Sequence, residues 1–147
     1  MTELAFHFGA PDKLAYACRL ARKAVSSGAK VVLVADANAV AQLDTDLWAL
    51  SATDFVPHCV ATGAQSASLQ KRTPVVLVTD VDQVPLHTGV LVNLTDAVPP
   101  GFERFDRLIE VVSTDAEDRN IARTRWRHYT EHGYTITRHD LALKRSD

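Results

Sequence analysis

The sequence predicts a single α/β domain with three layers and a mainly parallel sheet. Three observations support this prediction: continuous apolar runs, helical apolar stripes between them, and the absence of a repeat or an interdomain linker. The apolar runs cover residues 30–35, 74–79 and 89–94. Such runs are typical of parallel strands that are covered on both faces by crossover helices. A length of 147 residues suits one domain with a full hydrophobic core.

The first elements are predicted to form a strand–helix–strand unit. Residues 3–8 are expected to form a strand, and Asp12 is expected to cap the helix that follows. Gly28 suits the left-handed position just after that helix ends. The apolar face of the helix has a spacing of three or four residues, at Leu14, Ala17, Cys18, Ala21 and Val25. With strand 30–35, this unit favours a right-handed crossover and a parallel pair.

The remaining elements follow the same reasoning. A second helix is predicted from about Asn38 to Leu50, and Pro57 argues against a central strand over residues 54–58. Residues 61–73 are small and polar and predict a loop. Residues 105–112 are interpreted as a helical turn leading into a strand. A last long helix is predicted over residues 115–132, closed by Gly133, with residues 134–137 as a candidate edge strand.

Composition excludes several classes of protein. The net charge of −2 argues against a tight grip on a nucleic-acid backbone. No apolar stretch is long enough for a membrane span, and the first residues lack the pattern of a secretory signal. The two cysteines, Cys18 and Cys59, have no metal-type or redox-type spacing, so free thiols in a cytoplasmic setting are expected.

A search for chemistry predicts no catalytic residue, no cofactor and no metal. The turn at residues 8–12 has one glycine, where a dinucleotide fingerprint needs three, and no phosphate-binding loop ends in Lys-Ser or Lys-Thr. Asp36 follows a predicted strand and either binds a ribose or caps a helix. His128 and His132 share a helix face, but Tyr129 stands where zinc proteases have Glu, so a solvated face and a metal site remain alternatives.

Two predicted surfaces are candidates for binding partners. At 100° per residue, the helix over 115–132 has an arginine stripe at Arg119, Arg123 and Arg127. Trp126 and Tyr129 adjoin this stripe. The helix is either an ordinary amphipathic helix with a solvated basic side or a receptor for an acidic ligand with an apolar anchor.

The second surface contains Trp48 and Phe55. Trp48 lies about 100° from the direction of Leu47, and therefore leaves the core stripe of its helix. Phe55 follows in a loop. Neighbouring exposed aromatics favour a protein interface, whereas a small satellite core under the loop is the alternative.

An ordered set of motifs resembles the chi subunit of the bacterial DNA polymerase III clamp-loader assembly. The resemblance covers roughly residues 3–137, although residues 61–73 match poorly. Its motifs are Leu43-Asp-x-x-Leu-Trp48 with Phe55-Val-Pro-His58, Val90-Leu-Val-Asn-Leu94, Ile109-Glu-Val-Val112, and Ala122-Arg-x-Arg-Trp-Arg-x-Tyr129 with Gly133.

The resemblance implies a Rossmann-like fold and a non-catalytic subunit of a polymerase complex. Such subunits pair with the psi subunit, which tethers them to the clamp loader. They also bind the C-terminal tail of the single-stranded DNA-binding protein, which has several Asp residues and ends in an apolar pair with Phe and a free carboxylate. The resemblance thus links the replicase to coated lagging-strand template. An enzyme that binds a small ligand and an adaptor for a repair helicase are the alternatives.

The resemblance also assigns site residues by position. Trp48 and Phe55 fall on the psi-binding segment. Arg123 or Arg127 is expected to pair with the tail's terminal carboxylate, and Thr130 stands where relatives often have Arg. The expected tail-binding residues are Val112, Arg119, Arg123, Trp126, Arg127 and Tyr129.

Overall fold

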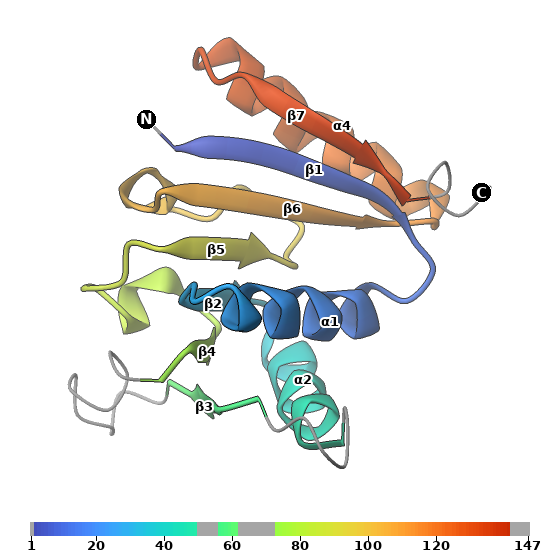
Figure 1. Ribbon diagram of the computed structural model, residues 1–147. Coiled ribbons are helices and arrows are strands. Elements are labelled where there is room, and N and C mark those ends of the chain that lie inside the picture. Colours follow the sequence, from blue (N-terminus) through green and yellow to red (C-terminus); the bar gives the residue numbers. More distant parts are fainter. Residues whose placement is uncertain (1, 50–55, 62–72, 142–147) are drawn as a thin grey trace.

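A seven-stranded sheet forms the centre of the computed structural model, which describes residues 2–49, 56–61 and 73–141 (Figure 1). Every pair of neighbouring strands in it is parallel. The strand order is β3-β4-β2-β5-β6-β1-β7. The strands are β1 (Glu3–Ala10), β2 (Val31–Val34), β3 (His58–Val60), β4 (Val75–Val78), β5 (Val90–Asn93), β6 (Arg107–Ser113) and β7 (Ile136–Asp140).

Helices cover both faces of this sheet. Helices α1 (Lys13–Ser26) and α2 (Ala37–Ala49) pack on one face. Helix α4 (Ala116–Glu131) packs on the other, beside the short 3₁₀ turns η1 (Val81–Gln83) and η2 (Phe102–Arg104). The predicted three-layer α/β fold is therefore confirmed, and the sheet is parallel throughout the described residues.

The central strands are buried because each of their faces meets a helix layer. In β2, Val31 and Leu33 join the cluster under α1 and α2, whereas Val32 and Val34 join the cluster under α4. Strand β4 has the same sequence, Val-Val-Leu-Val, and is equally buried. This double coverage explains why these segments are apolar at every position.

The helix ends follow the local signals in the sequence. Asp12 caps α1, where its side chain accepts a hydrogen bond of 3.1 Å from the backbone N–H of Ala15. Gly28 and Gly133 have φ angles of 86° and 85°, and each follows the C-terminal cap of its helix. A left-handed backbone at this position favours glycine, so both predicted helix stops are confirmed.

The expected pairing of the first two strands is wrong. Strands β1 and β2 are parallel members of one sheet, but β5 and β6 lie between them. Strand β1 pairs instead with β6 and β7, and it places Phe6 opposite Glu110 on one side and Arg138 on the other. An apolar pattern shows which strands are covered but carries no signal for their neighbours, which long-range packing decides.

Several boundaries differ from the predicted ones. The helical turn expected from residue 105 lies at Phe102–Arg104, before β6 begins. Strand β7 begins two residues later than the candidate strand over 134–137, and it extends to Asp140. Strand β3 begins directly after Pro57 and lies at an edge, as expected for a strand next to proline. Phe55 and most of the predicted loop over 61–73 lie outside the described residues.

Candidate binding surfaces

A hollow of about 330 Å³ lies where α4 faces β1 and β7. Arg119, Arg123 and Trp126 line it from α4, and Phe8 and Arg138 line it from the strands. The three arginines are exposed, whereas Trp126 is half-buried. Two arginines of the predicted stripe, Arg119 and Arg123, therefore meet Trp126 of the predicted aromatic edge at one site. Arg127 is exposed on the same helix but does not line the hollow.

Aromatic packing builds the floor of the hollow. The Trp126 ring lies 5.0 Å from the ring of Phe6 and 6.1 Å from that of Phe8, measured between centroids. The rings of Phe6 and Phe8 stack on each other at 5.6 Å. Because Trp126 rests on two neighbours from β1, its indole is held at the rim of the core rather than left free to rotate.

Arg138 is a lining residue that the sequence analysis did not identify. Its guanidinium carbon lies 4.5 Å from the centre of the Phe8 ring, which is a cation–π contact. The side chain remains 60% exposed. The only sequence signal is an alternating segment after Gly133, and that segment does not reveal that β7 lies beside β1.

A buried polar network holds α4 against the sheet. The Glu110 carboxylate on β6 accepts hydrogen bonds from Arg125 Nε at 3.1 Å and from Tyr129 Oη at 2.6 Å. Asn93 Nδ2 on β5 donates to both Glu110 oxygens at 3.0 Å. Burial raises the pKa of Glu110, and the Arg125 charge and the hydrogen bonds from Tyr129, Asn93 and Arg125 oppose that rise. These directional hydrogen bonds therefore fix the rotation of α4 about its own axis more tightly than apolar packing alone would.

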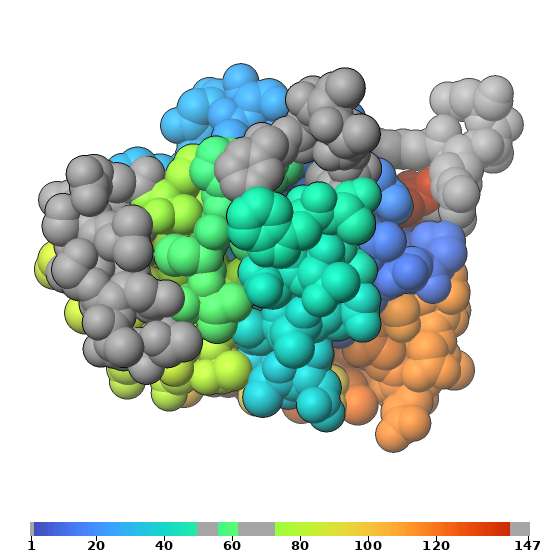
Figure 2. All heavy atoms as spheres, turned by 90° about the horizontal axis from the view of Figure 1, so that it is seen from below, coloured from blue at the N-terminus to red at the C-terminus, as the bar shows by residue number. Residues whose placement is uncertain are grey.

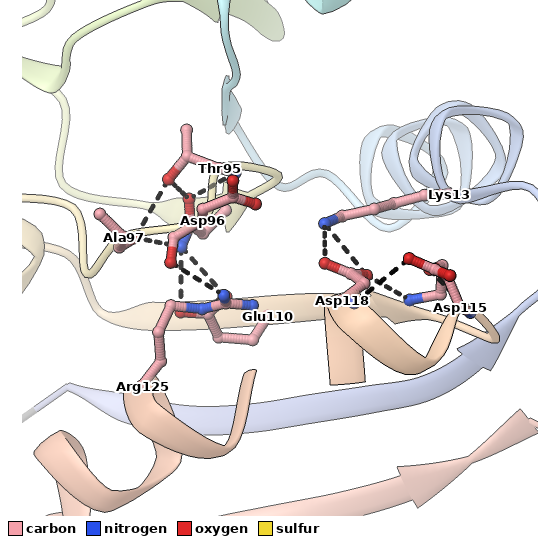
Figure 3. Close-up of polar contacts among 10 residues, drawn as sticks. Lys13, Thr95, Asp96, Ala97, Glu110, Asp115, Asp118 and Arg125 are labelled. Atoms are coloured by element: carbon pink, nitrogen blue, oxygen red, sulfur yellow. Dashed lines mark hydrogen bonds and ion pairs between the residues drawn. The ribbon is translucent and has the colours of Figure 1, made fainter. Parts of the chain in front are cut away.

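Figure 3 shows that a second polar contact fixes the first turn of α4. Asp118 accepts a hydrogen bond of 2.8 Å from the backbone N–H of Ser113, and Lys13 Nζ on α1 lies 3.3 Å from its Oδ1 atom. In the same figure, Arg125 reaches the loop after β5, where Nη1 donates to the carbonyl of Asp96 at 3.1 Å. The start and the middle of α4 are therefore both tied to neighbouring elements.

Two residues expected at the tail site are not at the surface. Tyr129 is fully buried, with its hydroxyl on Glu110, and burial raises its pKa. Val112 is fully buried in the same core cluster. The spacing of 100° per residue predicts Tyr129 at the edge of the arginine stripe. In the structure, the side of α4 that faces the core is centred on Ala122, Arg125 and Tyr129. Both residues therefore stand behind the floor of the hollow and do not line it.

Trp48 lies at a different surface, near the end of α2. It is 60% exposed, whereas the preceding Leu47 is buried in the core, so the predicted departure from the core stripe is confirmed. The Trp48 ring meets the His58 ring edge-on at 4.8 Å. His58 is itself held by the Val56 carbonyl, 2.7 Å from Nδ1, and its Nε2 lies 3.0 Å from Asp44 Oδ1. Figure 2 shows α2 and β3 together on this face of the molecule.

Comparison with known families identifies the chain. The family model for the DNA polymerase III chi subunit, HolC, matches residues 1–137. A curated protein from Pseudomonas aeruginosa, named DNA polymerase III subunit chi, is 35% identical over 131 residues, which cover 88% of this chain and 87% of the relative. The chain belongs to the chi subunit family.

Membership of the chi family places the chain among the accessory subunits of DNA polymerase III, and so in DNA replication. The matched range contains Trp48 and the whole of α4, and it ends one residue before Arg138. Both surfaces predicted from the sequence thus fall inside the part of the chain that the chi family model matches.

The helix N-termini of this chi-family chain carry carboxylates where a nucleotide-binding fold leaves room for phosphate. Asp12 caps α1, Asp36 accepts a hydrogen bond of 2.8 Å from the Ala39 N–H in α2, and Asp115 caps α4. Each carboxylate occupies an amide that would otherwise bind an anion. The helix-cap alternative for Asp36 is therefore confirmed.

The described residues contain neither a metal-binding cluster nor a membrane-spanning helix. Across the described ranges, no three His, Cys, Asp or Glu side chains gather closely enough to hold a metal ion. In the same part of the chain, no helix has both the length and the apolar character needed to cross a membrane.

Proposed function

We propose that this chain is a non-catalytic adaptor that binds the acidic C-terminal tail of the single-stranded DNA-binding protein in the hollow beside α4. The observation that carries the proposal is the meeting of Arg119 and Arg123 with the aromatic floor at Trp126. Membership of the chi family supports the proposal, because the motifs that resemble this family include a segment of α4 and the family model covers the whole helix.

The chemistry of the hollow suits such a tail. A ligand with several carboxylates and an apolar end needs cations and an aromatic or aliphatic contact, and both are within one hollow. Guanidinium groups pair with carboxylates through two parallel hydrogen bonds, which suits a terminal carboxylate. Arg127, one turn beyond Arg123, adds positive charge outside the hollow and attracts the tail at longer range.

The test is a fluorescence-anisotropy titration with a labelled peptide that has the tail sequence. Arg123→Ala is expected to weaken binding about fivefold, and affinity is expected to fall with salt because exposed charges are screened within about 8 Å at physiological ionic strength. Arg19→Ala is the matched control, since Arg19 is an exposed arginine on α1, on the opposite face of the sheet. If Arg119→Ala and Arg123→Ala both bind like the parent, the hollow is not the tail site.

The Trp48 surface is the proposed contact with the psi subunit, which connects the chain to the clamp loader. An exposed tryptophan braced by His58 is a preformed anchor, and truncating such an anchor typically costs an interface about 2 kcal/mol or more. Phe55 belongs to the same proposed surface on sequence grounds. A repair helicase is a further partner class for this surface.

Co-purification with the psi subunit tests this contact. Trp48→Ala is expected to lose the complex while its circular dichroism stays like that of the parent. Leu86→Ala is the control, because Leu86 is the other large apolar side chain that is strongly exposed among the described residues. Phe55→Ala is expected to behave like Trp48→Ala, and unfolding of that variant would place Phe55 in the core. Retention of psi by Trp48→Ala would remove this surface from the proposal.

A further inference from the structure

We propose that Arg138 on β7 is a binding residue of the same receptor, so that the tail is held between a helix and a strand and not on a helix face alone. This inference rests on the proposed function, because its ligand is the same acidic tail. It adds a residue beyond the range that the chi family model matches, which ends at residue 137.

The position of Arg138 follows from the pairing of the two chain ends. Strand β7 pairs in parallel with β1, which sets Arg138 opposite Phe6 and His139 opposite His7. Side chains alternate along a strand, so Phe6, Phe8 and Arg138 lie on the α4 side of the sheet. Arg138 therefore lines the hollow from the wall opposite to Arg119 and Arg123.

Its guanidinium group is held in place and remains available. The contact with the Phe8 ring at 4.5 Å orients the planar group over the floor of the hollow. Arg138 Nη2 forms a long ion pair with Asp140 Oδ2 at 4.0 Å, beyond hydrogen-bond distance, and the Arg138 side chain in this pair is exposed. Because the side chain is 60% exposed, its N–H donors can pair with an incoming carboxylate without breaking a buried contact.

The arrangement points to one kind of ligand. Three guanidinium groups from two elements surround an aromatic floor formed by Phe8 and Trp126. An apolar side chain that rests on this floor, with carboxylates on two sides of it, engages both walls at once. A single-stranded nucleic acid also combines negative charge with stacking rings. The acidic overall charge of −2 favours the peptide, because a nucleic-acid groove normally has a positive excess along the strand.

The experiment is the tail-peptide titration with Arg138 variants. Arg138→Ala is expected to weaken binding about three- to fivefold, as for the loss of one exposed charge pair. Arg138→Gln, which keeps a planar polar group over Phe8, is expected to weaken it similarly, and Arg138→Lys is expected to restore part of the affinity. Arg19→Ala removes the same charge from the opposite face of the sheet and is expected to bind like the parent.

A double-mutant cycle separates a direct ionic contact from a structural effect. Peptides in which one Asp at a time is replaced by Asn are titrated against the parent and Arg138→Ala. For the Asp that pairs with Arg138, the replacement is expected to cost several-fold less affinity in Arg138→Ala than in the parent. A merely structural role would leave the cost of every replacement unchanged, and that result overturns the proposal.

The outcomes distinguish the two proposals. If the parent binds the peptide, Arg123→Ala weakens it and the Arg138 variants bind like the parent, then Arg138 is not a binding residue and the proposed function stands. If the parent does not bind the peptide, both proposals fail. If Arg138→Ala weakens binding of a thymidine oligonucleotide but not of the peptide, then the hollow binds nucleic acid and the inference about the tail is wrong.

Discussion

Glu110 on β6 and Arg125 on α4 form a buried ion pair, with Arg125 Nε 3.1 Å from Glu110 Oε1 and both side chains almost without solvent exposure. The pair is central to the candidate receptor because it sets the rotation of α4 and thus the direction in which Arg119, Arg123 and Trp126 point. The Asn93 amide and the Tyr129 hydroxyl complete the hydrogen bonding of the carboxylate.

Breaking this pair from one side is expected to be costly. Arg125→Met leaves the Glu110 carboxylate buried without its cation, and such losses typically cost about 3–5 kcal/mol of unfolding free energy. Urea unfolding measures the change. Arg127→Met removes the same charge from the exposed side of the helix and is expected to change stability by about 0.5 kcal/mol or less.

The double variant tests whether the two residues act as a pair. Glu110→Gln with Arg125→Met is expected to cost less than the sum of the two single changes. Each single change leaves the partner's charge buried without its counter-ion, whereas the double change removes both charges. Additive costs, or an Arg125→Met variant as stable as Arg127→Met, would contradict the role assigned to the pair.

Tyr129→Phe separates support of the receptor from contact with the ligand. It removes the hydroxyl that donates to Glu110 and is expected to cost about 1.5–3 kcal/mol, as for a hydrogen bond to a charged group. Tail-peptide affinity is expected to stay within about twofold of the parent, because the ring is fully buried and is retained. A large loss of affinity with little loss of stability would show that Tyr129 reaches the ligand after all.

Asp118 is expected to make stability depend on pH in acid. Burial by itself raises the pKa of this carboxyl, but the Ser113 N–H and the Lys13 charge outweigh it and hold the pKa below its ordinary value. A lowered pKa in the folded state stabilises the protein above the unfolded-state pKa of about 3.9, and this contribution is lost as the pH falls through the folded-state value.

Urea midpoints of the parent and Asp118→Asn test this dependence. At pH 7 the variant is expected to be less stable, and the difference is expected to shrink as the pH falls below about 4. Asp106→Asn, which alters an exposed carboxylate just before β6, is the control and is expected to change the midpoint little at pH 7. An equal difference between parent and Asp118→Asn at pH 7 and pH 3 would contradict the assigned pKa.

Isothermal titration with ATP, GTP and NAD is expected to give no saturable heat. The reason is that Asp12, Asp36 and Asp115 occupy the helix N-termini where a nucleotide phosphate would bind, and their charge repels it. Saturable heat with any of the three would contradict this expectation and support the alternative that the chain is an enzyme that binds a small ligand.

Much of the fold was predictable because its signals are local. The caps at Asp12 and Gly28 depend on the backbone of one turn, and the apolar runs record that a strand is covered on both faces. The same locality explains the success at Trp48, whose direction follows from its spacing to Leu47 on one helix. The arginines at 119 and 123 were found in the same way, from the turn of a single helix.

The parts that failed involve contacts between distant segments. The angular position of Tyr129 on its helix was correct, but only the packing of α4 on β6 shows that this direction points inward, toward Glu110. Arg125 carried no sign in the sequence that a buried carboxylate would meet it.

The sequence by itself determined most of the helices and strands, the ends of α1 and α4 at Gly28 and Gly133, and that one helix carries cations beside an aromatic ring. Only the tertiary structure decided that β1 lies between β6 and β7, and thereby that Phe8 and Arg138, from opposite ends of the chain, line one hollow with Trp126. The physical reason is that element formation depends on torsional preference and hydrophobic periodicity over a few residues. Strand order depends on the free energy of burying whole surfaces against one another, to which every element contributes.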